Sequence, residues 1–259
     1  MARSLVTGAA KRVGRQLALY LASRGHDVAV HYASSRTDAE AVVEEIRAMG
    51  RHAVALQADL LDDNQTTELF GSAVSELGGP VTCLVNNASI FEFDTILCAT
   101  RKNWDRHMGS NLRAPFVLTQ AMAAQDLLPS TGENGEQISS GLIINMIDQR
   151  VRKLTPEFAT YTLSKAALWA LTQTAAQALA PAIRVNAIGP GPTLRGGRQS
   201  AAQFATQRQS TVLGRGSDPA DLAAAIGYLL DAPAVTGQLL CVDGGQHLAW
   251  QTPDVVGVE

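Results

Sequence analysis

The feature that most constrains the fold of this chain is a regular alternation of short apolar runs with longer amphipathic segments. The short runs are rich in β-branched residues and lack polar alternation, so each predicts a strand buried on both faces. Seven such runs occur, at 4–7, 28–32, 52–57, 81–85, 141–146, 183–188 and 238–242. The segments between them repeat apolar residues at helical spacing, as in Val13, Leu17 and Leu21. This alternation predicts a parallel sheet covered by helices on both faces.

No shift in composition and no internal repeat divides the 259 residues, of which 46% are hydrophobic and 17% are charged. These values are typical of a well-packed globular protein. We therefore predict a single doubly wound α/β domain over 1–250, with strand order 3-2-1-4-5-6-7, and a C-terminal tail at 251–259. Two stretches interrupt the alternation. The polar stretch 128–141 predicts a surface loop, and the longer excursion at about 189–216 predicts a lid.

Charge and cysteine content argue against several classes of function. The formal net charge of −3 lacks the basic excess of a nucleic-acid-binding domain. Cys83, Cys98 and Cys241 are far apart and odd in number, so they predict neither a disulfide framework nor a cysteine-based metal site. No charged-then-apolar leader precedes Ser4, and no apolar run approaches the ~18 residues that span a bilayer. We expect a cytoplasmic protein without metal, nucleic-acid or membrane partners.

The stretch "TGAAKRVG", from Thr7 to Gly14, joins the first predicted strand to the first predicted helix. It therefore lies at the carboxyl edge of the sheet, where doubly wound folds bind ligands. Gly8 permits a tight turn, Gly14 lets the helix pack closely on the sheet, and the start of the helix offers free N–H groups to a pyrophosphate. Arg12 occupies the place of a third glycine. The stretch predicts a nucleotide site with a basic residue in its turn.

The end of the second predicted strand indicates which dinucleotide binds. NAD sites generally place an acid there for the ribose 2′-OH, whereas a 2′-phosphate requires cations and hydroxyls. After "VAVHY", which ends at Tyr32, come an alanine, two serines and Arg36, with no acid before Asp38. This pattern favours NADPH over NADH, with Ser35 and Arg36 as candidate ligands of the phosphate. The alternative is that Arg36 is a solvated arginine at the start of a helix.

In the second half of the chain, "YTLSK" places Tyr161 and Lys165 one helical turn apart on the same face. An ammonium group beside a phenol favours the phenolate and so lowers the pKa of the tyrosine. In isolation, a tyrosine and a lysine on a helix surface would look the same. Tyr161 and Lys165 therefore indicate a catalytic pair only when they are considered together with the other residues at the strand ends.

Several further polar or small residues follow predicted strands and meet at the same edge of the sheet. They are Asp59 in "ADL", Asn87 and Ala88 in "NNA", Asn111 in "SNLRAPF" and Thr193 in "GPGPT". Together with "TGAAKRVG" and "YTLSK", this set resembles the short-chain dehydrogenase/reductase family over essentially the whole chain. The resemblance implies a Rossmann-type fold of seven strands, a nicotinamide dinucleotide, a small-molecule substrate and a homotetramer.

The resemblance also implies a role for each matched residue. Tyr161 would be the catalytic acid, Lys165 would lower its pKa and hold the nicotinamide ribose, and Asn111 would support a proton-relay water. Asp59 would bind the adenine amino group. The other implied cofactor contacts are Gly8, Arg12, Val13, Gly14, Tyr32, Ser35, Arg36, Leu60, Asn87, Ala88, Ser89, Pro190, Gly191 and Thr193.

One residue departs from the pattern of the family. Most members carry a serine thirteen positions before the tyrosine, where this chain has Asp148. A carboxyl group accepts hydrogen bonds when ionised and donates one only when protonated. An ionised carboxylate beside a polarised ketone oxygen would be repulsive, so the change disfavours an ordinary ketone reductase.

The departure at Asp148 has a counterpart within the family. "INMID", the arginine in the glycine turn and the serine after "NNA" together resemble the pteridine reductase branch. That resemblance implies a pterin lying flat between the nicotinamide and Phe91, close to Arg12 and Ser89. Asp148 would help to protonate a ring nitrogen, and Tyr161 would interact with the edge of the pterin.

Three functions remain open at this point. The first is an NADPH-dependent reductase of a pterin or dihydrofolate-like C=N bond, where a proton-donating carboxyl makes chemical sense. The second is a carbonyl reductase of the 3-oxoacyl or quinone type. The third is a non-catalytic dinucleotide-binding sensor or scaffold, against which the intact Tyr161, Lys165 and Asn111 count.

Overall fold

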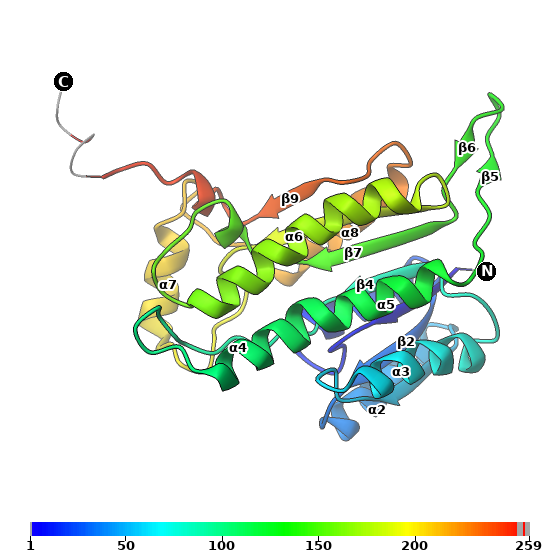
Figure 1. The fold of residues 1–259 in the computed structure, drawn as a ribbon, viewed down its shortest axis with the longest axis horizontal. Helices are drawn as coiled ribbons and strands as arrows, with labels where there is room; N and C mark the ends of the chain where they lie inside the picture. Colours follow the sequence, from blue (N-terminus) through cyan, green and yellow to red (C-terminus); the bar gives the residue numbers. More distant parts are fainter. Residues whose placement is uncertain (1, 253–255, 257–259) are drawn as a thin grey trace.

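A seven-stranded parallel sheet lies at the centre of the computed structural model, which describes residues 2–252 and 256 (Figure 1). Its strands are β1 (Arg3–Val6), β2 (Asp27–Tyr32), β3 (Ala53–Gln57), β4 (Cys83–Asn86), β7 (Gly141–Met146), β8 (Ile183–Pro190) and β9 (Leu239–Val242). They are arranged in the order β3-β2-β1-β4-β7-β8-β9. The predicted Rossmann-type class, the seven strands and their order are confirmed.

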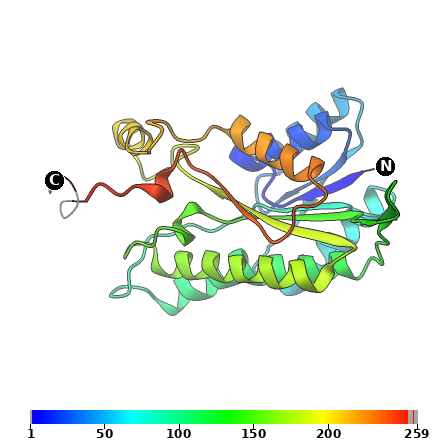
Figure 2. The same cartoon turned by 90° about the horizontal axis from the view of Figure 1, so that it is seen from above.

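Helices cover both faces of the sheet (Figure 2). One face carries α1 (Arg12–Ser23), α2 (Arg36–Ala48) and α8 (Pro219–Asp231), and the other carries α3 (Asp63–Glu76), α4 (Arg101–Met108), α5 (Ala114–Ala123) and α6 (Ala159–Leu179). On the first face, Leu21 of α1 and Ile226 of α8 belong to one buried cluster. On the second, Phe70 of α3 and Leu118 of α5 belong to another. The periodic apolar residues of the sequence thus form two cores, one on each side of the sheet.

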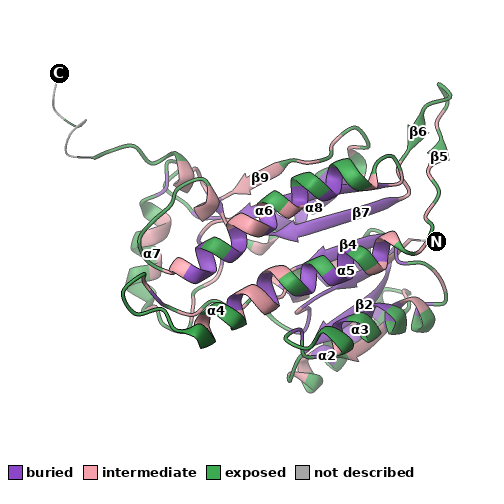
Figure 3. Cartoon of the chain, in the orientation of Figure 1, coloured by how far each residue is buried: buried purple, intermediate pink, exposed green. Residues whose placement is uncertain are grey.

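The central strands are buried except at Arg3 of β1 and Pro190 of β8, and Figure 3 shows the complete burial of β7. The two edge strands differ from the prediction of complete burial. Ala55 and Leu56 of β3, and all four residues of β9, retain partial exposure. Each of these strands has only one neighbouring strand, so its outer side is less completely covered.

The two interrupting stretches contain structure that the sequence analysis did not predict. The predicted loop 128–141 includes a short antiparallel hairpin of β5 (Ser130–Thr131) and β6 (Gln137–Ile138), which projects from the body in Figure 1. Its turn uses the glycine-rich composition that indicated a loop, because Gly135 has a φ of +77°. The predicted lid contains the helix α7 (Ala201–Gln209). Of the predicted tail, 253–255 and 257–259 lie outside the described residues.

Membrane-spanning helices and metal-binding clusters are both absent from the described residues. None of the helices there combines the length and the apolar character needed to cross a bilayer. Nor do three or more histidine, cysteine or acidic side chains gather there in an arrangement that could hold a metal ion.

Candidate active site

The glycine turn is fastened to the end of β4, the strand beside β1. Thr7 Oγ1 accepts hydrogen bonds from the backbone N–H groups of Asn87 and Ala88, at 2.9 and 3.0 Å. In return, Asn87 Nδ2 donates to the carbonyl oxygens of Thr7 and Gly8, at 2.8 and 3.2 Å. The "TG" and "NNA" motifs therefore form one unit, because the parallel pairing of β1 with β4 brings their ends together.

The turn has no room for side chains at its two glycines. Gly8 has a φ of +62°, and a Cβ atom on Gly14 would lie 2.2 Å from the carbonyl oxygen of Gly8. The predicted tight turn and close packing are confirmed. Arg12 also has a positive φ, of 54°, at the position where a glycine is usual. The chain thus keeps a glycine-like backbone there, at a cost on the order of 1 kcal/mol, while it carries a guanidinium.

His31, which the sequence analysis did not assign to the site, braces the turn from β2. Its Nδ1 accepts from the N–H of Gly8 at 2.9 Å, and its Nε2 lies 3.1 Å from the carbonyl oxygen of Ala58. Because a backbone N–H can only donate, the ring proton must be on Nε2. Burial lowers the pKa of His31 to about 4, so the ring is neutral near pH 7. A lone polar residue within "VAVHY" was the only signal for this role.

A cavity of about 710 Å³ opens in front of the turn. Nine predicted cofactor contacts line it: Gly8, Arg12, Val13, Gly14, Asp59, Leu60, Asn87, Ala88 and Ser89. The lining residues that were missed are Lys11, His31, Ala33, Ser34, Gln57, Leu61, Ile90, Arg106 and Ser110. The other predicted cofactor contacts are not among the lining residues: Tyr32, Ser35, Arg36, Tyr161, Lys165, Pro190, Gly191 and Thr193.

The starts of α1 and α2 fit the phosphates of a dinucleotide. Neither helix has a side-chain hydrogen bond at its N-cap, and α1 has no acid in its first turn, so backbone N–H groups are available to an anion. Lys11, at the start of α1, lines the cavity and pairs with Asp38 at 2.9 Å. The side chain of Arg36 is 73% exposed and lies 3.9 Å from Glu40, which agrees with the solvated alternative. Ser34 and Lys11 line the cavity, whereas Ser35 and Arg36 are not among its lining residues.

Tyr161 and Lys165 lie on the buried face of α6, with 6% and 2% of their surfaces exposed. Tyr161 donates its phenolic hydrogen to Asp148 Oδ2 at 3.0 Å. Lys165 Nζ donates to the carbonyl oxygen of Met146 at 2.8 Å and lies 5.7 Å from the centre of the Tyr161 ring. Met146 is the last residue of β7, and Asp148 follows it by two positions. The end of this strand therefore accepts hydrogen bonds from both Tyr161 and Lys165.

The three titratable groups change one another's pKa values. Burial lowers the pKa of Lys165 to about 8, and the Asp148 carboxylate opposes this shift. Burial also raises the pKa of Asp148, so the carboxyl holds its proton to higher pH than usual. Burial and then the charge of Asp148 raise the pKa of Tyr161 well above its ordinary value. The predicted lowering by Lys165 is therefore wrong for this structure, since Asp148, not Lys165, contacts the phenol.

Asn111 occupies a π-helical turn, Gly109–Arg113, between α4 and α5. π turns are rare and frequently occur at functional sites. The Asn111 amide donates to Ile90 O at 2.9 Å and to Ser164 Oγ at 3.1 Å, and its oxygen accepts from Ile90 N at 2.8 Å. This fully buried residue joins the loop after β4 to α6. Its predicted role in a proton relay is not tested by these contacts.

Phe91, the predicted substrate platform, packs beside Tyr161. Its ring centre is 4.6 Å from that of Tyr161 in an edge-to-face arrangement, and 45% of its surface is exposed. A second ring, Phe158, stacks on Phe91 with centres 4.3 Å apart and planes 12° apart. Phe158 was missed. It precedes α6 with a φ of 57°, a conformation that is uncommon for a bulky residue and concentrates at functional sites.

A series of buried hydrogen bonds joins the segment after Phe91 to the start of α6. The ring of His107 accepts from Glu92 N at its Nε2 (3.1 Å) and donates from Nδ1 to Thr160 Oγ1 (2.7 Å). The hydroxyl of Thr160 donates in turn to the buried carboxylate of Asp94. These hydrogen bonds hold the segment after Phe91 against the start of α6. No sequence motif indicated them.

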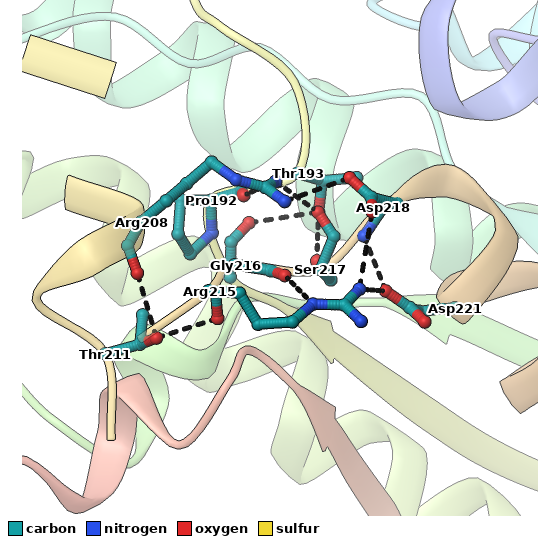
Figure 4. Close-up of polar contacts among 10 residues, drawn as sticks. Pro192, Thr193, Arg208, Thr211, Arg215, Gly216, Ser217, Asp218 and Asp221 are labelled. Carbon is teal, nitrogen blue, oxygen red and sulfur yellow. Dashed lines mark hydrogen bonds and ion pairs between the residues drawn. The ribbon is translucent and has the colours of Figure 1, made fainter. Parts of the chain in front are cut away.

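The predicted lid is fastened at its base, as Figure 4 shows. Arg208 of α7 donates to the carbonyl oxygens of Pro192 and Ser217, at 3.0 and 2.7 Å, and pairs with Asp218 at 3.0 Å. The hydroxyl of Thr193 bonds to that of Ser217, so it is engaged within the base of the lid. Residues on both sides of α7 are thus joined at one point.

Fold and site together define a nucleotide-binding α/β protein with a buried tyrosine and lysine and a half-buried aspartate beside the nucleotide cavity. Residues 8–247 match the family model described as enoyl-(acyl carrier protein) reductase. The chain is 34% identical over 250 residues to a 3-oxoacyl-[acyl-carrier-protein] reductase, FabG, of Staphylococcus epidermidis, covering 95% of this chain and 98% of that one. It therefore belongs to the short-chain dehydrogenase/reductase family and is an oxidoreductase by family.

Solved structures of the same fold include two further relatives. One is FolM, alternative dihydrofolate reductase 1, from Brucella suis in complex with NADP, which is 41% identical, with a TM-score of 0.90 and 98% of each chain covered. Another is the angucycline C-6 ketoreductase LanV with bound NADP, which is 30% identical, with a TM-score of 0.85 and coverage of 95% and 96%. The family thus includes both dihydrofolate and ketone reductases among the relatives of this chain.

Proposed function

We propose that this chain is an NADPH-dependent reductase of a pterin or dihydrofolate-like C=N bond. The observation that carries the proposal is the hydrogen bond from Tyr161 to Asp148, a carboxyl whose pKa is raised by burial. A carboxyl that retains its proton can donate it to a ring nitrogen. The Brucella protein, named as an alternative dihydrofolate reductase, supports the same reading.

The chemistry divides between the cofactor and the side chains. NADPH, when bound, supplies a hydride to the carbon of the C=N bond. Asp148 and Tyr161 share one hydrogen-bonded proton position and together deliver a proton to the nitrogen, so a C–H and an N–H bond form. Lys165, buried and held by Met146 O, places a positive charge close to both groups at neutral pH. Asn111 keeps the loop that carries Ser89 and Phe91 against α6.

NADPH is the proposed cofactor because serines follow β2 where an NAD site carries an acid, and one lysine lines the same cavity. Lys11 and Ser34 line the cavity near the end of β2 and are proposed to bind the 2′-phosphate. The pyrophosphate is assigned to the start of α1 beside Gly8, Arg12 and Gly14. The NADP complexes of the Brucella relative and of LanV support NADPH as the cofactor.

A homotetramer is the proposed assembly. Large apolar side chains remain on the surface in the part of the chain that the structure describes, including Ile96 and Leu97 before α4 and Leu163 on α6. Exposed apolar side chains of this size are candidates for contact with a neighbouring subunit. The cytoplasmic location remains a prediction.

Carbonyl reduction is the second candidate, because FabG and LanV relatives match nearly the whole chain. Purified protein should be assayed for NADPH oxidation with dihydrobiopterin and dihydrofolate, beside a β-ketoacyl ester and a quinone. Saturable turnover of a pterin is the expected result. Turnover confined to the carbonyl compounds would overturn the pterin assignment, and turnover of any substrate would remove a purely non-catalytic role.

Asp148→Ser tests the observation behind the proposal. We expect pterin turnover to fall about 10²-fold or more, the usual contribution of a positioned proton donor. Asp148→Asn, which keeps the size of the side chain, should behave similarly. An increase in pterin turnover in either variant would show that Asp148 is not a proton donor.

A further inference from the structure

Arg198, at the tip of the lid before α7, contacts the aromatic pair at the active site. Its Nη2 donates to the carbonyl oxygen of Phe91 at 2.9 Å. Its guanidinium carbon is 5.2 Å from the ring centre of Phe91 and 5.5 Å from that of Phe158. No sequence motif and no step of the proposed reaction uses this side chain.

The distances show where the guanidinium lies. The two rings are nearly parallel, with centres 4.3 Å apart. A cation above the outer face of one ring would be much farther from the second, whereas Arg198 is almost equally far from both. It therefore lies beside the stack, at the edges of the rings, on the side from which the lid approaches. A guanidinium there borders the substrate platform without covering the outer face of either ring.

A second guanidinium, that of Arg150, lies 5.1 Å from the centre of Phe158. Its Nη1 donates to Thr155 and to the carbonyl oxygen of Glu157, while its Nε is buried without a hydrogen-bond partner. Buried donors of this kind are rare in folded proteins. Arg150 lies in the 3-10 turn that follows Asp148, so its side chain approaches the aromatic pair from the end of β7.

Arg150 and Arg198 belong to the minority of arginines that have no carboxylate partner among the described residues. Most arginines in the described ranges pair with acids, for example Arg24 with Asp231 at 2.6 Å and Arg113 with Asp63 at 2.7 Å. Neither Arg150 nor Arg198 forms an ion pair within the described residues, although the whole chain has a net charge of −3. The mouth of the site thus carries two guanidinium groups without ion pairs, and among the described residues the side chain of Arg198 donates only to Phe91 O.

We propose that Arg198 determines specificity by binding a carboxylate on the tail of the substrate, with Arg150 adding to the positive potential. The inference rests on the proposed function and names its substrate class: pterins with an anionic tail, as in dihydrofolate, over pterins with an uncharged tail. The pterin ring would lie at Phe91, and the tail would leave the site past the lid. A planar guanidinium fork matches carboxylate geometry, which a lysine ammonium does not reproduce.

The test compares wild type with Arg198→Gln and Arg198→Lys, using dihydrofolate and dihydrobiopterin as paired substrates. We expect Arg198→Gln to raise the KM for dihydrofolate about tenfold, corresponding to about 1.4 kcal/mol, and to leave the KM for dihydrobiopterin unchanged. Arg198→Lys should recover part of the loss. Added salt should raise the dihydrofolate KM of wild type and have less effect on the variant.

Arg24→Gln is the matched control, because the Arg24 guanidinium also lies close to an aromatic ring, 5.8 Å from the centre of Tyr20, and the change removes the same charge. It should alter neither KM. Equal changes for both substrates in Arg198→Gln would mean that Arg198 only positions Phe91, and unchanged kinetics would mean that it does not meet the tail. Either result overturns the inference while leaving pterin reduction intact. A wild type that reduces no pterin would instead overturn the proposed function, and this inference with it.

Discussion

The two sides of the active site are built in different ways. On the cofactor side, the turn at Gly8 is fixed by hydrogen bonds that the Thr7 hydroxyl and His31 Nδ1 accept and the Asn87 amide donates, at distances between 2.8 and 3.2 Å. On the substrate side, half-exposed rings and guanidinium groups meet through stacking and single hydrogen bonds. The lid tip is held by Arg12, which donates to the carbonyl oxygens of Leu194 and Arg195 at 3.1 and 3.0 Å.

The difference follows from what each side must bind. A pyrophosphate is recognised by backbone N–H groups, so the backbone must already have the correct shape. A substrate has to enter and leave, so its side can use contacts that exchange with solvent at little cost. Exposed ion and cation–π contacts contribute about 0.5–1 kcal/mol each, whereas buried, unsatisfied polar groups cost more than that. The comparison predicts that substitutions on the two sides damage different steps of the reaction.

The largest expected effect comes from Tyr161→Phe, at the point where the two sides meet. The variant keeps the ring against Phe91 but removes the hydroxyl that bonds to Asp148. We expect the rate of hydride transfer to fall about 10²- to 10⁴-fold, because a positioned acid is lost. The NADPH dissociation constant should not change, since Tyr161 does not line the cavity. Single-turnover kinetics and a fluorescence titration with NADPH measure the two quantities separately.

An equal loss of NADPH binding and of turnover in Tyr161→Phe would contradict the claim that the two sides serve different steps of the reaction. Tyr161 would then be a structural residue common to both sides. Near-UV circular dichroism of the variant shows whether its packing is retained.

The next largest effect is expected from Gly14→Ala on the cofactor side. The added Cβ would lie 2.2 Å from Gly8 O and 2.5 Å from Asn87 Nδ2, so the start of α1 must move away from the turn. Overpacking of this kind costs about 1–3 kcal/mol, and NADPH affinity should fall by about tenfold or more. Gly71→Ala is the control, because Gly71 also lies within a helix and a Cβ there would meet nothing within 4 Å. That change should leave NADPH binding unaltered and stabilise the protein by about 0.5–1 kcal/mol.

If Gly14→Ala binds NADPH as tightly as wild type, the turn is more adaptable than its hydrogen bonds indicate. The distinction between a fixed cofactor side and a displaceable substrate side would then fail. Isothermal titration of NADPH into both alanine variants decides between these outcomes.

The sequence predicted the cofactor side better than the substrate side, for a physical reason. Gly8, Gly14 and Asn87 are constrained by local backbone geometry, which leaves a pattern of fixed spacing in the chain. The same is true of Tyr161 and Lys165, which share one helix. By contrast, Arg198 reaches Phe91 from 107 positions away, and Phe158 meets Phe91 only because the tertiary fold brings them together.

Errors in the sequence predictions have the same origin. The predicted effect of Lys165 on the pKa of Tyr161 assumed that two residues on one helix face interact with each other. In the fold, Met146 O accepts from Lys165, and Asp148 accepts from Tyr161. Similarly, Arg36 follows β2 as a phosphate ligand would, yet its side chain lies along α2 near Glu40. Spacing identifies which element carries a residue but not the partner that its side chain finds.

The smallest expected effect concerns His31 and the acid stability of the cofactor side. Its pKa falls from 6.5 to about 4 on folding because the ring is buried. Between these values the unfolded chain binds a proton that the folded chain does not, so stability is fully present above about pH 6.5 and declines as the pH falls toward 4. Lowering the pH from 7.5 to 5.5 should therefore reduce the free energy of unfolding by about 1.4 kcal/mol through this group.

His31→Asn, whose Oδ1 can accept from Gly8 N but does not titrate, should lose that part of the pH dependence. Urea unfolding at the two pH values, with exposed His52→Asn as control, measures it; the other histidines are common to all three proteins and cancel. The same pH dependence in His31→Asn and wild type would mean that folded His31 accepts the proton, and that the turn on the cofactor side yields more readily than its hydrogen bonds suggest.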